Sequence, residues 1–355
     1  MHVVSNKMKI EKSTVASQKG DITLVTLTNA KGAKVTLCSL GAGIVGVEVP
    51  DRNGVMADVV LGYADVKDYY YDGPCAGKVP GRCANRIALG NFTLDGKDYS
   101  LAINNGPNAL HGGPEGFQNQ IWDTEVCDCG VVKFTYKAAD GEEGYPGNLV
   151  ATATYEWTDD CELKLVLGAE TDAPTVVNLT NHAYFNLAGH NSGSVLNHKL
   201  TLNAHLFLPT DDTLIPTGDL ASVKGTPMDF TEPKTLGQDI KADYPALVYG
   251  KGYDNCYVIN GWNAGQMRLA AVLEDTESGR VLEVSTTQPG VQIYTGNWLA
   301  GCPVNKAGRS YDDYDGVAIE CQGLPDSINK PQFPSVVLRP GEKYSEIITF
   351  KFTNK

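Results

Sequence analysis

Apolar and polar residues alternate with a period of two along much of the chain. The run from Ile22 to Thr28 alternates in this way, and so do the runs that begin at Val131 and at Leu149, which are rich in β-branched and aromatic side chains. Successive side chains of a strand point to opposite faces, so this alternation predicts strands with one buried face. We therefore expect a chain built mainly of β-strands.

Short turn sequences between such runs predict hairpins. The dipeptide Asp95-Gly96 supplies the positive φ angles of a tight turn between residues 91–94 and 97–101. Similar signals predict three further hairpins, which join residues 155–157 to 163–167, 267–273 to 281–285, and 336–338 to 347–352.

Helical periodicity is weak, and it predicts short helices only near Val66–Tyr71 and Thr235–Ile240. The glycines of Gly41–Gly46 match the G-x-G-x-x-G pattern of dinucleotide-binding loops. That fold needs a helix directly after the loop, and the strand-like run Val47–Pro50 follows instead. We expect bend or bulge glycines there, and no nucleotide cofactor. Without linkers or repeats, the pattern predicts one large antiparallel β-sandwich, a single domain over residues 1–355.

Charge excludes some classes of function. The 355 residues include 29 Lys and Arg against 42 Asp and Glu, a formal net charge of −13. A negative field repels phosphate backbones and anionic lipids, so we expect no nucleic-acid or membrane partner. No run approaches the ~20 apolar residues of a membrane span. The first residues also lack the apolar core of a signal peptide, so we expect a cytoplasmic protein.

The nine cysteines suggest neither a disulfide framework nor a zinc site. Their number is odd, no C-x-x-C occurs, and the only close pair is Cys127 and Cys129. We expect reduced thiols. The six histidines show no H-x-x-x-H spacing on a helical pattern, so no metal site is expected either.

Hydrogen-bonding side chains gather in a few Gly-rich or strand-end segments with apolar neighbours. Such side chains, with nearby aromatic rings, form the donor and acceptor set that reads sugar hydroxyls. Each segment also has a structural explanation, since Asn-Gly-Pro-Asn is a common turn and a strand histidine is often structural. Glu320 is unusual, because a carboxylate on an apolar strand is costly unless it is paired or functional. The segments are residues 81–87, 104–113, 178–187, 252–255 and 316–322.

These segments and their neighbours resemble the aldose 1-epimerase (galactose mutarotase) family. The resemblance covers residues 81–344 and implies a large antiparallel β-sandwich. It further implies that the protein interconverts the α and β anomers of free hexoses such as galactose and glucose, without a cofactor. The matching stretches are GRCANRIALGNFTLDGKDYSLAINNGPNALHGG, GFQNQIW, NLTNHAYFNLAG, LPTDDTLIPTG, GYDN, TTQPGVQIYTGNW and IECQGLPDSINKPQFPSVVLRPGEKY.

The resemblance assigns roles to single residues. His182 matches the general acid of the family and Glu320 its general base. The sequence departs from the family pattern at Cys321, where Thr is usual, and at Leu324, where an aromatic residue is frequent; the second change could loosen one wall of the pocket. The family's sugar-binding positions fall on Asn85, Arg86, His111, Asp254 and Gln292.

The chemistry explains why these residue types suit the task. A hemiacetal opens when a base removes the proton of the C1 hydroxyl while an acid protonates the ring oxygen. Ionised Glu is purely an acceptor, and the unperturbed pKa of His, about 6.5, keeps both of its protonation states accessible. Each positioned proton transfer contributes on the order of 10²–10⁴ in rate.

Three alternatives remain open at this point. A hexose-6-phosphate 1-epimerase would need a cluster of Arg and Lys around the phosphate, and the five polar segments hold only Arg82 and Arg86. A glycoside hydrolase would need two flanking carboxylates, for which Asp254 and Glu320 could be imagined. A non-catalytic sugar-binding protein on the same fold would most simply lack His182 or Glu320. We expect a monosaccharide as the partner and a monomer or loose homodimer.

Overall fold

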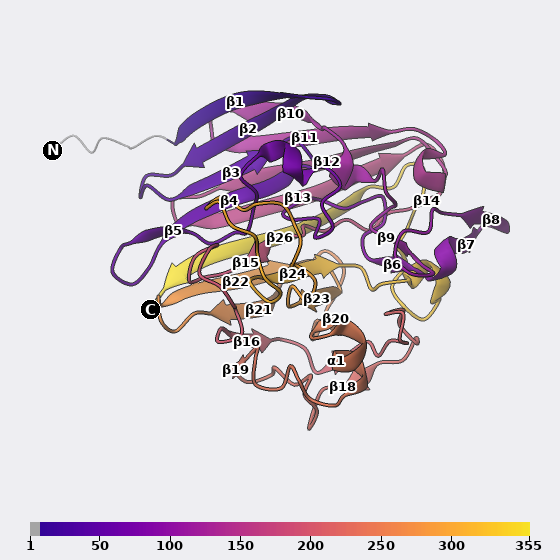
Figure 1. The fold of residues 1–355 in the computed structure, drawn as a ribbon. Coiled ribbons are helices and arrows are strands. Elements are labelled where there is room, and N and C mark those ends of the chain that lie inside the picture. The colour runs from indigo at the N-terminus through magenta and orange to yellow at the C-terminus, as the bar shows by residue number, and fades with distance from the viewer. Residues whose placement is uncertain (1–7) are drawn as a thin grey trace.

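Antiparallel strands dominate the computed structural model, which describes residues 8–355 (Figure 1). A five-stranded sheet has the order β1 (Lys9–Ser17), β2 (Gly20–Thr28), β3 (Lys34–Cys38), β4 (Gly43–Pro50) and β5 (Met56–Asp58). A nine-stranded sheet has the order β10 (Asp123–Cys127), β11 (Val131–Ala138), β12 (Leu149–Trp157), β13 (Glu162–Thr171), β26 (Tyr344–Asn354), β22 (Arg280–Thr286), β21 (Arg268–Glu274), β16 (Lys199–Leu202) and β19 (Lys234–Thr235). A six-stranded sheet has the order β15 (Tyr184–Phe185), β24 (Val317–Gln322), β23 (Gly290–Tyr294), β20 (Asp254–Val258), β17 (Leu206–Phe207) and β18 (Ala221–Ser222).

Smaller elements connect these sheets. The two-stranded pairs are β6 (Arg86–Ile87) with β9 (Ala109–Leu110), β7 (Asn91–Leu94) with β8 (Lys97–Ser100), and β14 (Thr175–Val176) with β25 (Val337–Leu338). The helical segments are α1 (Pro245–Gly250) and five 3₁₀ turns, η1 (Val66–Tyr69), η2 (Ala88–Gly90), η3 (Phe117–Asn119), η4 (Glu142–Gly144) and η5 (Ser327–Asn329).

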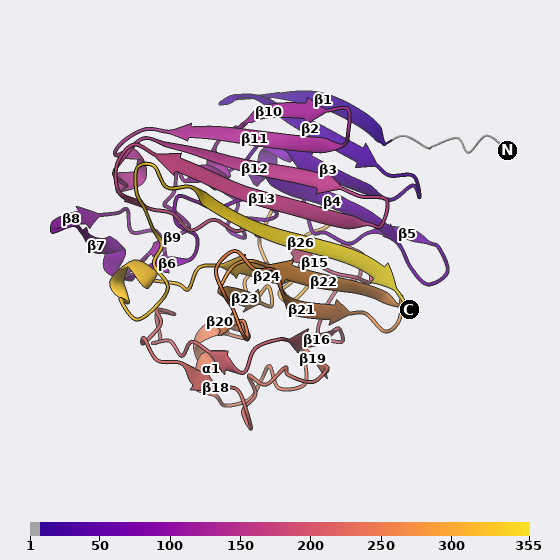
Figure 2. The same cartoon turned by 180° about the vertical axis from the view of Figure 1, so that it is seen from behind.

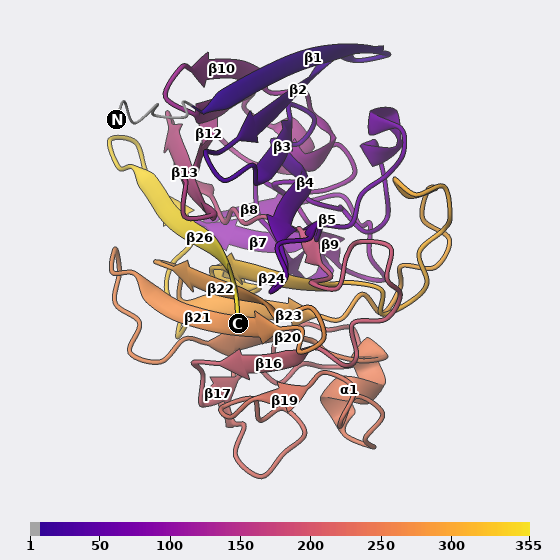
Figure 3. The ribbon, with the colours of Figure 1, turned by 90° about the vertical axis from the view of Figure 1, so that its left-hand side faces the viewer.

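The sheets form two layers, which confirms the predicted β-sandwich. The nine-stranded sheet covers the side seen in Figure 2, whereas the five-stranded sheet faces the viewer in Figure 1. Figure 3 shows β4 and β13 in separate layers, with β26 beside β13. A bridge between Val60 and Phe185 links the five-stranded sheet to the six-stranded one. One apolar core holds Val35 and Val47 of one layer together with Leu165 of the other.

The period-two pattern predicts the buried faces correctly. Every second residue of β12 is buried, from Leu149 to Trp157, and its neighbour β13 buries Leu163, Leu165 and Leu167 in the same way. Such alternation turns one face of each strand toward the facing sheet.

Three of the four predicted hairpins are confirmed. They are β7–β8, β12–β13 and β21–β22. The fourth prediction, that residues 336–338 pair with 347–352, is wrong. The turn is present, but β25 pairs with β14, and β26 enters the other layer between β13 and β22. A turn sequence fixes a change of direction and does not fix which strand becomes the partner.

The helix predictions are half right. Val66–Tyr69 forms η1, but residues 235–240 begin in β19 and continue as turns, so the helix predicted there is wrong. The one α-helix of the described residues was missed, although Pro245 at its first turn is a helix-start signal. The glycines of residues 41–46 bend the chain as predicted: Gly41 has a φ of 66°, and a register shift lies opposite at residues 36–37.

The cysteines depart from expectation at one pair. The Sγ atoms of Cys127 and Cys129 lie in bonding contact in the turn between β10 and β11, so the prediction of reduced thiols is wrong for these two. The turn itself is the cause, because it brings the two Cα atoms to 5.2 Å. The other seven cysteines are free. Within residues 8–355 no helix is long and apolar enough to cross a membrane. The prediction that the chain has no signal peptide rests in part on residues 1–7, which lie outside the described residues.

Candidate active site

Strand register brings three of the predicted residues to one face of the six-stranded sheet. Glu320 of β24 lies directly opposite Gln292 of β23, and Asp254 of β20 lies opposite Tyr294 of β23. Side chains of cross-strand partners share a face, as do residues two apart on a strand. Glu320, Gln292, Tyr294 and Asp254 therefore point to the same side, although they are far apart in sequence.

His182 approaches Glu320 from the segment between β14 and β15. The backbone of His182 is fixed on both sides, because its N–H donates to the Lys78 carbonyl at 2.9 Å and its own carbonyl accepts from the Gly77 N–H at 2.9 Å. Its Nε2 atom lies 3.4 Å from Oε1 of Glu320, and both side chains are buried. The two residues predicted as acid and base are thus direct neighbours.

The short β6–β9 pair supplies a second wall. The His111 N–H donates to the Asn85 carbonyl at 3.0 Å, and the Asn85 N–H donates to Nδ1 of His111 at 3.1 Å. Both residues have positive φ angles, 61° and 52°, in the left-handed region where Asn and His are among the more tolerated residues. The His111 ring meets the His182 ring edge-on, with centroids 5.2 Å apart.

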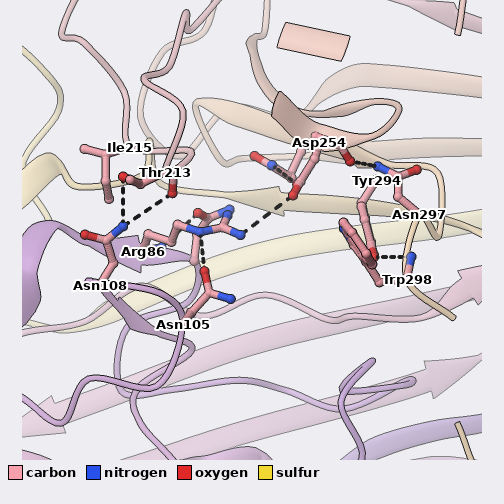
Figure 4. Close-up of polar contacts among 12 residues, drawn as sticks. Arg86, Asn105, Asn108, Thr213, Ile215, Asp254, Tyr294, Asn297 and Trp298 are labelled. Carbon is pink, nitrogen blue, oxygen red and sulfur yellow. Dashed lines mark hydrogen bonds and ion pairs between the residues drawn. The ribbon is translucent and has the colours of Figure 1, made fainter. Parts of the chain in front are cut away.

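Arg86 connects this wall to the sheet. Its Nε donates to Oδ1 of Asn105 at 3.0 Å, and its guanidinium lies 3.8 Å from the Asp254 carboxylate (Figure 4). The other oxygen of Asp254 accepts a hydrogen bond from Nε2 of Gln292 at 2.7 Å. A continuous polar chain therefore runs from Asn105 through Arg86 and Asp254 to Gln292.

These groups surround a cavity of about 510 Å³. Two cavities of similar size elsewhere, of about 530 and 560 Å³, contain no histidine among their lining residues, all of which are described. The seventh predicted residue, Gln292, does not line the cavity and lies behind Asp254. The six predicted residues that do line it are Asn85, Arg86, His111, His182, Asp254 and Glu320.

Several lining residues were not named individually in the prediction from the sequence. Tyr184 and Tyr294 flank His182, with ring centroids at 5.0 and 6.4 Å, and the Tyr184 hydroxyl donates to the Pro74 carbonyl at 2.8 Å. Trp298, a residue that is 65% exposed, lies at the rim. Period two offered a signal for Tyr294, two positions after Gln292. Asn105 lies in the polar segment 104–113 and Trp298 in the matched stretch TTQPGVQIYTGNW, but neither was assigned a role, because loops determine where both lie.

Burial shifts the acid–base behaviour of the site. It lowers the pKa of His182 to about 4 and holds the pKa of His111 well below its ordinary value. The pKa of Glu320 is raised well above its usual range, first by burial and then by the Asp254 charge, against an opposing effect of Arg86. Burial thus holds both members of the His182–Glu320 pair toward their neutral forms.

The ligand atoms of His111, His182 and Glu320 lie within 4.8 Å of one another, close enough to consider a metal. The hydrogen bond from the Asn85 N–H makes Nδ1 of His111 an acceptor, so the neutral ring carries its proton on Nε2. A nitrogen that carries a proton has no lone pair for a metal. The arrangement suits His111 as a hydrogen-bond donor instead, and the cluster as a proton-transfer site.

The two departures from the family pattern lie away from the cavity. Cys321 follows Glu320 on β24, so its side chain points to the opposite face of the strand, where it belongs to the main apolar core. Leu324 packs in a small buried cluster with Leu208, Cys256 and Phe333. Neither is a lining residue, so the expected effect of Leu324 on the pocket wall has no direct contact to support it.

The chain is similar to known aldose epimerases along most of its length. The family model described as aldose 1-epimerase matches residues 23–351. Galactose mutarotase of Bos taurus is 46% identical over 320 residues, 90% of this chain and 91% of the relative, and aldose 1-epimerase of Escherichia coli is 39% identical over 331 residues, 93% and 94%. A solved aldose epimerase homologue from C. elegans superposes with a TM-score of 0.85 at 31% identity, covering 98% of this chain and 99% of that one. The chain belongs to the aldose 1-epimerase family.

Proposed function

We propose that this enzyme interconverts the α and β anomers of free hexoses, such as galactose and glucose, by opening and reclosing the sugar ring. The observation that carries the proposal is the buried His182–Glu320 pair, 3.4 Å apart, at a cavity lined by sugar-binding groups. The relatives named as galactose mutarotases support galactose as a substrate.

In the reaction, the Glu320 carboxylate removes the proton of the C1 hydroxyl while His182 protonates the ring oxygen. The C1–O5 bond breaks, and a free aldehyde forms. Rotation about the C1–C2 bond presents the other face of the aldehyde, and the same two transfers run backward as the ring closes. Neither residue needs to be reset, because each ends the cycle in the protonation state in which it began.

The pair works with a single proton. Burial favours protonated Glu320 beside neutral His182, and one proton transfer across the 3.4 Å gap produces the carboxylate and the imidazolium that the reaction uses. Arg86 favours the carboxylate, because its charge acts against the raised pKa of Glu320. Bound sugar hydroxyls supply further hydrogen bonds to both charged groups.

The remaining polar groups hold the sugar. Arg86 and the Nε2–H of His111 donate to sugar oxygens, and Asn85 lies beside them. Asp254 accepts from sugar hydroxyls, with its own orientation fixed by Gln292. Donors preorganised in this way stabilise charge that develops on the sugar oxygens.

Charge at the cavity supports an unphosphorylated substrate. Arg86 is the single Lys or Arg among its lining residues, all of which are described, whereas three carboxylates, those of Asp212, Asp254 and Glu320, also line it. A phosphate needs several cationic donors to offset its charge, so this cavity disfavours a hexose 6-phosphate. We further propose a single domain, a monomer or loose homodimer, and a cytoplasmic location.

Polarimetry tests the proposal. Freshly dissolved α-galactose approaches its equilibrium rotation slowly, and catalytic amounts of the protein should accelerate that decay without changing its end point. Galactose 6-phosphate, followed in parallel by NMR, should gain much less. Binding of galactose with no acceleration would instead identify a non-catalytic sugar-binding protein.

A further inference from the structure

The turn between β10 and β11 brings together two cysteines that the proposed reaction does not use. Cys127 ends β10 and pairs with Val131, the first residue of β11. Gly130 closes the turn with a φ of 85°, and its N–H donates to the Cys127 carbonyl at 3.0 Å. This tight reversal places the Cα atoms of Cys127 and Cys129 5.2 Å apart, a separation typical of disulfides, with the sulfur atoms in bonding contact.

Exposure distinguishes this pair from the other thiols. Both residues face solvent, whereas six of the seven free cysteines are buried and Cys302 is half-buried. Thiol–disulfide exchange requires an incoming thiolate to reach a sulfur atom in line with the bond that breaks, so accessible disulfides are the labile ones. Among the cysteines of residues 8–355, external thiols have ready access only to this pair.

A local hydrogen bond gives the two sulfurs different roles. The Cys129 N–H donates to Sγ of Cys127 at 3.3 Å. A hydrogen bond to sulfur favours its thiolate form, so Cys127 is the better leaving group when the disulfide is attacked. External thiols should therefore attack Sγ of Cys129.

We expect the disulfide to contribute little to the stability of the fold. Its covalent loop spans three residues, and the entropy that a cross-link removes from the unfolded chain grows with loop length, so this cross-link removes little. It also lies apart from the cavity, because none of the lining residues belongs to β10, β11 or their turn. Neither stability nor the active site accounts for it.

We propose that Cys127 and Cys129 form a reversible dithiol–disulfide site that exchanges with low-molecular-weight thiols, independently of the sugar site. An external thiolate attacks Sγ of Cys129, the Cys127–Cys129 bond breaks, and Cys127 leaves with the electron pair as a thiolate. A second external thiolate attacks the external sulfur of the mixed disulfide, and Cys129 leaves in turn. In total, one protein disulfide and two external thiols give the protein dithiol and one external disulfide.

The test is a redox titration of the full chain. The protein is equilibrated in buffers of graded glutathione to glutathione disulfide ratio, quenched with acid and alkylated, and the peptide that contains both cysteines is analysed by mass spectrometry. We expect a reversible change from oxidised to doubly alkylated peptide that follows the square of the glutathione concentration over the glutathione disulfide concentration. Full alkylation at every ratio, or a disulfide that is reduced only in denaturant, would overturn the proposal.

Variants test the mechanism. In Cys127→Ser the partner thiol is missing, so Cys129 should accumulate a stable glutathione adduct, which the wild type should release. Cys302→Ser is the matched control and should titrate like the wild type. Galactose mutarotation should proceed at the same rate in the oxidised and reduced forms. A mutarotation rate that follows the redox state would contradict the independence of the disulfide from the sugar site. If the protein proved to have no mutarotase activity, the proposed function would fail, but the result of the redox titration would still test the disulfide proposal.

Discussion

Opposite pKa shifts at His182 and Glu320 have one cause, their removal from water. Burial disfavours the charged form of each, so it lowers the pKa of the imidazole and raises that of the carboxyl group. For a pair in direct contact, the protons come off in two steps that belong to the pair as a whole. In the proposed reaction the active form is the singly protonated pair, and the two pKa shifts set the range of pH over which that form exists.

The pH profile of kcat/KM should therefore be a broad bell. Adding a second proton to the pair creates a buried cation, so the acid limb should fall near the pKa of about 4 of His182, well below the ordinary histidine value. Removing the last proton ionises the pair, so the alkaline limb should fall above the ordinary pKa of Glu. Initial rates by polarimetry across pH 3–10 would measure both limbs. A single acid limb at the ordinary pKa of histidine would contradict this account.

Glu320→Gln should make the protein more stable at pH 7–8 even as it removes the base. The folded-state pKa of Glu320 is raised, so between the unfolded and folded values the native state binds more protons than the unfolded one, and stability falls as pH rises through this window. Glutamine avoids that loss. We expect a gain of about 1 kcal/mol, roughly 2 °C in melting temperature. At pH 4, where the wild-type carboxyl is protonated, the difference should vanish; an equal gain at both pH values would exclude ionisation as its source.

At the scale of elements, the sequence predicts local structure better than partnership. Alternation identified β12 and β13, and the dipeptide at residues 95–96 identified the β7–β8 hairpin, because both depend on neighbours in the chain. The partner of β25 depends on distant packing, and the sequence predicted it wrongly.

The candidate site shows the same difference between features set by local sequence and features set by distant packing. Six of the seven predicted site residues line one cavity, and they could be named because the family motifs carry them. The positions of Asn105 and Trp298 depend on how loops from different sheets meet. The local sequence of a loop does not determine which other loop it meets in the fold.

Asp254→Ala should chiefly weaken sugar binding. Asp254 begins β20 and accepts from Gln292 on the neighbouring strand, so its carboxylate is fixed before the sugar arrives. Losing one charged hydrogen bond costs roughly 1.5–3 kcal/mol, which corresponds to a rise in KM of about 10- to 150-fold. Some loss of kcat should accompany it. Steady-state kinetics would measure the change, with the exposed carboxylate variant Asp219→Ala as a control. A native KM with a collapsed kcat would place Asp254 in the chemistry.

For the molecule as a whole, we expect that the proposed reaction needs no bound metal ion. The hydrogen bond at Nδ1 of His111 leaves its other nitrogen protonated, which opposes metal binding at the three-residue cluster. Exhaustive chelation should therefore leave kcat unchanged. Loss of activity that a divalent ion restores would contradict this reading.

Buried thiols near the site in sequence should also be dispensable. Cys83 and Cys321 pack in apolar clusters and do not line the cavity. Replacement of both by Ser should leave mutarotation near the wild-type rate, with a modest loss of stability because a hydroxyl replaces a buried sulfur. If galactose kinetics on the folded double variant showed a collapsed kcat, a role for one of these thiols would have been overlooked.

In the proposed reaction His182 and Glu320 act as one proton-transfer unit, and a double-mutant cycle on galactose mutarotation tests this coupling. His182→Asn and Glu320→Gln should each reduce kcat by on the order of 10²–10⁴. The double variant should be little slower than the slower single variant, because ring opening fails once either end of the proton path is missing. Thermal melts and galactose binding would establish that each variant is folded. Folded, galactose-binding single variants that exchange anomers at nearly the wild-type rate would contradict the account.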